Sequence, residues 1–131
     1  MIALGRKDVN AVGSTNAMFQ MQSSNYGSTW TKQYTNITDI ALSTPSVVNT
    51  NNGNLNLFYF ERGAGKLRLR QNNWSDVWDN PTNWSESEVV ATGTTNIQDT
   101  GNVNACAFNN HLVATYYSGD STDTGIYSVI V

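Results

Sequence analysis

Short runs of alternating apolar and polar residues, separated by turn residues, make up most of this chain. Residues 66–70 alternate leucines with cations, and residues 17–22 and 104–108 show the same period of two, which is typical of strands with one buried face. Residues 55–60 are apolar enough to form a strand that is buried on both faces. No run of useful length has helical periodicity, so the pattern predicts an all-β fold.

Turn residues divide this pattern into ten expected strands. These are residues 2–6, 17–22, 31–37, 46–48, 55–60, 66–70, 89–91, 105–108, 111–117 and 126–131. Residues 71–88, which contain three tryptophans, are expected to form a polar loop.

The strands fall into groups that repeat along the chain. Several landmarks recur at a spacing of about 55 residues, which lies in the range expected for the blades of a β-propeller. The pairs are Arg6 and Arg62, Gly63 and Gly119, Trp30 and Trp84, and Tyr59 and Tyr116. We therefore expect one propeller segment over residues 1–131, with blade-like repeats of four-stranded antiparallel meanders at about 1–40, 41–92 and 93–131.

These repeats do not complete a ring. The first group has three strands and lacks an inner one, the second has four, and the third has three and lacks an outer one. Propellers typically need at least four blades, so about two and a half blades leave the fold open. We expect closure by partner chains, most simply two or three copies of this one, or by further blades of a longer parent chain.

Composition excludes several classes of partner. Only 13% of residues are charged and the net charge is −3, so no basic patch is large enough to hold a nucleic acid backbone. No signal peptide or membrane-length apolar run occurs, so no membrane insertion is expected. One Cys and one His give no zinc spacing, and we predict no metal and no cofactor. Cys106, in an alternating run, is expected to be a buried small hydrophobe.

One turn has a sharp sequence motif, Ser23-Ser-Asn-Tyr-Gly-Ser-Thr-Trp30. The Asn25 side chain can accept backbone N–H bonds inside the turn, and Gly27 supplies a positive φ that other residues resist. Ser23 and Thr29 can tie the two flanks together, and Trp30 is expected to pack a large ring onto the sheet.

This stretch resembles the Asp box, Ser-x-Asp-x-Gly-x-Thr-Trp, of bacterial neuraminidase repeats and other sialidase-like β-propellers. Asn25 stands where the family usually has Asp, and residues 43–48 and 57–62 look like the blade openings and second strands of the same repeats. In that family the box is a structural turn on the outer side of a blade. The resemblance therefore implies a fold more directly than a function.

The family's active site sets an expectation for the arginines. Sialidases hold the substrate carboxylate with three arginines, because bidentate guanidinium–carboxylate pairs are strong. Arg6 and Arg62 end equivalent strands and could share one rim of the ring. Arg68 and Arg70 are expected on the solvated, outward face of an alternating strand.

The family's catalytic residues are not recognisable here. Sialidases use a Tyr activated by a Glu as nucleophile and an Asp as acid, but Asn102 and Val103 occupy the place where family members often carry the Tyr. Glu61 is expected to point away from Arg62 along a regular strand. No catalytic residue is predicted, and the sequence favours binding over catalysis.

The tryptophan-containing loop indicates a sugar site. Aromatic faces stack on the apolar side of a pyranose, and Asn and Asp side chains bind its hydroxyls. Trp84 matches Trp30 in the repeat and is expected to be a packing ring, which leaves Trp74 and Trp78 either to bind a ligand or to hold their loop down.

We therefore predict non-catalytic glycan binding, as in a lectin or the receptor-binding component of a phage tail or other virion, outside the cell or on a particle. The predicted ligand-binding residues are Arg6, Arg62, Asn73, Trp74, Asp76 and Trp78. Two alternatives remain at this point. One is a glycoside hydrolase of the exo-sialidase type whose site other blades complete, and the other is a structural ring subunit.

Overall fold

The computed structural model of the protein describes residues 2–7, 17–38, 45–50, 52–61, 65–79, 82–85, 88–92, 102–119 and 124–131. These residues form ten strands and one short helix. The elements are β1 (Ile2–Lys7), β2 (Ala17–Gln22), β3 (Thr31–Tyr34), β4 (Ser46–Asn49), β5 (Asn54–Glu61), β6 (Lys66–Asn73), α1 (Trp74–Asp79), β7 (Glu88–Thr92), β8 (Val103–Phe108), β9 (His111–Gly119) and β10 (Thr124–Ile130).

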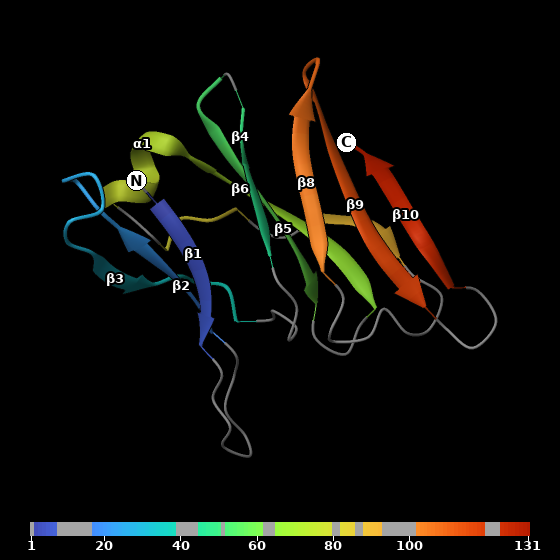
Figure 1. Ribbon diagram of the computed structural model, residues 1–131, viewed down its shortest axis with the longest axis horizontal. Coiled ribbons are helices and arrows are strands. Elements are labelled where there is room, and N and C mark those ends of the chain that lie inside the picture. The colour runs from blue at the N-terminus through green and yellow to red at the C-terminus, as the bar shows by residue number, and fades with distance from the viewer. Residues whose placement is uncertain are drawn as a thin grey trace.

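The strands form three antiparallel sheets, each a meander of consecutive strands. The first sheet is β1-β2-β3, the middle sheet is β4-β5-β6-β7, and the third sheet is β8-β9-β10. Figure 1 shows them following one another from the N-terminal sheet at the left to the C-terminal sheet at the right. The all-β expectation and the grouping into three, four and three strands are confirmed, and the described strands do not close into a barrel.

The middle sheet is covered on both faces. Residues 55–60 of β5 are all buried, as their apolar composition predicts. Neighbouring residues of a strand point to opposite faces. The odd-numbered residues of this run therefore face one neighbouring sheet, and the even-numbered residues face the other. One buried cluster joins the first and middle sheets: Met18, Ile37, Leu55, Leu57, Tyr59 and Trp84. The other joins the middle and third sheets: Val48, Phe58, Phe60, Leu67, Leu69, Val103, Leu112 and Ala114.

The opening strands of the middle and third sheets lie side by side. β4 and β8 are adjacent, and the Ala105 backbone N–H donates to Ser46 Oγ at 3.0 Å. On the other side, Asn36 Nδ2 donates to the Trp84 carbonyl oxygen at 3.2 Å, which ties the end of the first sheet to the middle one. The three sheets are therefore consecutive layers in chain order.

The turn between β2 and β3 has the hydrogen bonds that its sequence predicts. Asn25 Oδ1 accepts the Thr29 N–H at 2.9 Å, and Ser23 Oγ accepts the Gly27 N–H at 2.7 Å. Gly27 has a φ of 91°, in the region that favours glycine. Trp30 packs less completely than expected and belongs to the exposed residues, whereas Trp84 is buried as predicted.

Three local expectations were wrong. The third strand ends at Tyr34, although the chain stays bonded to β2 beyond it: the Thr35 N–H donates to the Met18 carbonyl oxygen, and the Met18 N–H donates to the Ile37 carbonyl oxygen, both at 3.0 Å. The expected loop at residues 71–88 contains the last residues of β6 and the helix α1. Cys106 is exposed, because it pairs with Val113 on the face of the third sheet that points away from the middle sheet.

Candidate functional site

The start of α1 is fixed at the open end of the β5–β6 hairpin, where β5 begins and β6 ends. Asn73, the last residue of β6, pairs with Asn54 at the start of β5. The Trp74 backbone N–H donates to the Gly53 carbonyl oxygen at 2.8 Å, which anchors the first helical residue to the turn before β5. The helix therefore begins at a defined place at one end of the middle sheet.

The side chain of Asn73 caps this helix. Its Oδ1 accepts the Ser75 backbone N–H at 3.0 Å and the Ser75 hydroxyl at 2.8 Å. This is the bond that a favoured N-cap residue makes with the second helical N–H, and Asp76 in the first turn adds a favourable interaction with the helix dipole. The cap makes a six-residue helix stable at a place where sequence periodicity gives no helical signal.

The cap leaves several polar groups and an indole ring at the surface. Trp74 is exposed, and Ser75 and Asp76 beside it are exposed as well. Ser75 Oγ lies 3.4 Å from Asp76 Oδ1. An exposed indole can stack on a sugar ring, and an exposed carboxylate and hydroxyl can pair with sugar hydroxyls. The structure thus brings together three of the predicted residues, Asn73, Trp74 and Asp76.

The remaining predicted residues are not part of this cluster. Trp78 belongs to α1, one helical turn after Trp74, but its side chain lies outside the described residues. Arg6 lies in β1 in register with Met18, and its side chain is likewise outside them, as is the whole of Arg62. Glu61, the residue before Arg62, ends β5 at the end of the middle sheet opposite to Asn73.

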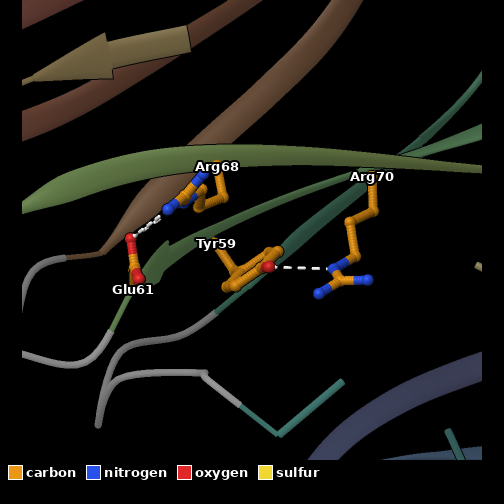
Figure 2. A network of polar contacts seen from close by, with 4 residues as sticks. All are labelled: Tyr59, Glu61, Arg68 and Arg70. Atoms are coloured by element: carbon orange, nitrogen blue, oxygen red, sulfur yellow. Dashed lines mark hydrogen bonds and ion pairs between the residues drawn. The ribbon is translucent and has the colours of Figure 1, made fainter. Parts of the chain in front are cut away.

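A second polar cluster lies on the face of the middle sheet that points to the first sheet. Arg68 donates from Nε at 2.8 Å and from Nη2 at 2.6 Å to Glu61 Oε2 (Figure 2). Arg70 donates from Nε to the Tyr59 hydroxyl at 2.9 Å and from Nη1 to the Ser85 carbonyl oxygen at 2.9 Å. Both arginines are partly buried, so the expectation of a solvated outward face was wrong.

The hairpin register explains this cluster. Tyr59 pairs with Arg68, and Glu61 pairs with Lys66, so all three cations of β6 share a face with Tyr59. The alternation in the sequence gives the two faces of β6, but it does not reveal that the face with the cations is partly buried. Since Arg68 is paired with a carboxylate and Arg70 donates to two oxygens, the guanidinium groups of both are engaged within the chain, which does not favour capture of a ligand carboxylate.

Two further classes of site are not found in the described part of the chain. No group of three or more His, Cys, Asp or Glu side chains is placed to hold a metal ion among the residues that the structure describes. Within the same residues, no helix has the length and apolarity needed to cross a membrane.

Comparison with known proteins adds no family to this geometry. No protein-family model matches the chain, and no curated protein matches it either.

Proposed function

We propose that this protein binds carbohydrate without catalysis, at the exposed cluster formed by Asn73, Trp74 and Asp76 at the start of α1. The observation that carries the proposal is that Trp74, Ser75 and Asp76 are all exposed on a helix start that is held by the Asn73 cap and the Gly53 carbonyl. A fixed indole binds a sugar face at a low cost in conformational entropy.

The scaffold for this site is proposed to be an open array of propeller blades of the sialidase-like kind. Three consecutive meanders stacked in chain order support this, as do the side-chain bonds of the turn from Ser23 to Trp30. With this scaffold, the protein would act as a lectin or as the receptor-binding component of a virion or similar particle, outside the cell, where glycans are exposed.

Glycan-array screening, followed by calorimetry on the best ligand, tests the proposal. The variant Trp74→Ala is expected to weaken binding about tenfold or more, a loss of ~1.4 kcal/mol. Tyr26→Ala is the matched control, because Tyr26 is an exposed aromatic residue in a different turn. Its affinity should stay at the wild-type value.

The same samples separate the proposal from its alternatives. Turnover of a fluorogenic sialoside would favour a glycoside hydrolase. Absence of both binding and turnover would favour a structural subunit and overturn the proposal. Equal losses in Trp74→Ala and Tyr26→Ala would place the site elsewhere.

A further inference from the structure

The middle and third sheets repeat each other position by position. Residues 55–60 of β5 and residues 112–117 of β9 are offset by 57 positions. The pairing partners follow the same correspondence, since Phe60 pairs with Leu67 and Tyr117 pairs with Ile126. Phe60 is thus equivalent to Tyr117, and Leu67 to Ile126.

The equivalent residues differ sharply in exposure. On the middle sheet, Phe60 and Leu67 are 1% and 0% exposed, because the third sheet covers them. On the third sheet, Tyr117 and Ile126 are 54% and 83% exposed. A face that is apolar in the same places, but uncovered, is built for burial.

More residues extend this pattern over the outer face of the third sheet. Val48, buried against the third sheet, corresponds to the exposed Cys106, which pairs with Val113. Val113 also pairs with the exposed Ile130. The described residues of this face include no Lys, Arg, Asp or Glu. Its partner must therefore supply an apolar and largely uncharged surface.

The outer face of the first sheet offers aromatic rings to such a partner, together with one cation, Lys32. Met18 and Gln20 are buried towards the middle sheet, so the alternation of β2 puts Phe19 on the opposite face, where it pairs with Tyr34. Lys32 is folded over the two rings, with its Nζ 4.1 Å from the centre of Phe19 and 5.2 Å from that of Tyr34. The face thus presents aromatic rings with the Lys32 ammonium held over them.

On this side, Trp30 is more exposed than its equivalent in the next repeat. Trp84 contributes to the cluster between the first and middle sheets and is 4% exposed. Trp30 occupies the equivalent position one repeat earlier and is 38% exposed. If the series of sheets continued beyond the first sheet, the added sheet would cover Trp30. That sheet would do so with the same face that the third sheet leaves exposed.

We propose that the outer face of the third sheet packs on the outer face of the first sheet of a second copy of this chain. The same kind of contact already occurs inside the chain, where the first sheet packs on the middle sheet and the middle sheet packs on the third. A contact between two different faces is heterologous, and it closes into a ring when the rotation allows.

The number of copies follows from the number of sheets. The described residues of each chain form three sheets, and propellers typically have 4–8 blades, so two copies would bring six sheets to the ring. This number rests on the propeller scaffold proposed above, whereas the pairing of the two faces does not. Neither face includes Trp74, so the state of assembly can be measured whether or not the protein binds a sugar.

Light scattering after size-exclusion chromatography tests the proposal on the full chain. The wild-type protein is expected to have twice the chain mass of 14.4 kDa. Ile126→Glu, on the third sheet, and Tyr34→Glu, on the first, should each give a monomer with an unchanged circular dichroism spectrum. Val89→Glu is the control, since Val89 is an exposed aliphatic residue on β7 of the middle sheet, and it should leave the dimer intact.

Mixing the two monomeric variants distinguishes heterologous from like-to-like contact. In a mixed pair, one of the two contacts combines an unmodified third sheet with an unmodified first sheet, so a dimer should form again. A wild-type monomer, open-ended higher oligomers, or a Tyr34→Glu variant that remains dimeric would each overturn the proposal. Should Ile126→Glu lose its folded spectrum, Tyr117→Glu tests the same face.

Discussion

Arg70 donates a hydrogen bond from its Nε at 2.9 Å to the hydroxyl of Tyr59, which belongs to the buried cluster between the first and middle sheets. The Tyr59 ring is fully buried, and Figure 2 shows its hydroxyl directed towards the guanidinium group. A buried hydroxyl without a partner is costly, and a guanidinium is a strong donor. Arg70 therefore provides a hydrogen-bond partner for the buried Tyr59 hydroxyl.

We expect Tyr59→Phe to lower the free energy of unfolding by about 1.5–3 kcal/mol, because it removes a hydrogen bond to a charged group. The ring volume is unchanged, so the loss reports on the hydroxyl alone. Urea unfolding at fixed protein concentration measures it. Tyr26→Phe, at an exposed ring, should change stability by less than about 0.5 kcal/mol. Equal effects of the two substitutions would contradict this role for Arg70.

The Asn25 side chain holds its turn with both ends. Its Oδ1 accepts the Thr29 N–H, and its Nδ2 donates to Thr29 Oγ1 at 2.8 Å. Asn25→Ala should therefore cost about 1–2 kcal/mol, whereas Asn25→Asp keeps the acceptor and should cost less than about 0.5 kcal/mol. Thermal unfolding measures both, with Ser28→Ala as a control in the same turn. An equal loss in Asn25→Asp and Asn25→Ala would show that the acceptor is not the stabilising group.

Asn73 is expected to act on the sugar site through the helix. Asn73→Ala removes the cap of α1, at a cost of about 0.5–2 kcal/mol, and should weaken glycan binding because Trp74 loses its fixed position. Asn73→Asp preserves the accepting oxygen and should restore both stability and binding. Calorimetry on the array-selected glycan compares the three proteins. Loss of binding in Asn73→Asp with a stable fold would instead indicate direct contact between the Asn73 amide and the ligand.

Tyr116 gives the fold a dependence on alkaline pH. It stacks on Tyr127, with ring centres 6.0 Å apart, and meets Phe60 edge-on at 5.9 Å. Burial raises the pKa of the Tyr116 phenol above its ordinary value of 10.0. The folded state thus holds this proton more tightly than the unfolded state does, so the stability is fully present below pH 10.0 and falls as the pH rises through the folded pKa.

Urea unfolding at a series of pH values checks this effect. Tyr116→Phe removes the titrating group, and its stability should decline less above pH 10.0 than that of the wild-type protein. Parallel declines in the two proteins would assign the alkaline loss to other groups.

Much of the fold is predictable from sequence because its signals are local. The alternation in β6 and the apolar run in β5 place strands without knowledge of any neighbour. The turn at Asn25 is predictable for the same reason, since its donors and acceptors lie within eight residues. The helix α1 escapes prediction because six residues give too little periodicity, and its signal is the single cap residue Asn73.

Burial is predicted less well, because it depends on sheets that lie far apart in sequence. Alternation separates the two faces of a strand but does not say which faces are covered. Arg70 was expected in solvent and is partly buried beside Tyr59, whereas Cys106 was expected in the core and lies exposed. The candidate site was predictable only where its residues are neighbours in sequence, as Asn73, Trp74 and Asp76 are.

The reactivity of Cys106 tests the central claim that the stack of sheets continues into a second copy. This is the chain's single cysteine, and it lies exposed on the outer face of the third sheet. A contact across that face would cover its thiol, so labelling with an aromatic disulfide reagent should be slow in concentrated protein and should accelerate on dilution. Ile126→Glu should react rapidly at every concentration. A fast, concentration-independent rate in the wild-type protein would contradict the account, because it would leave this face uncovered in solution.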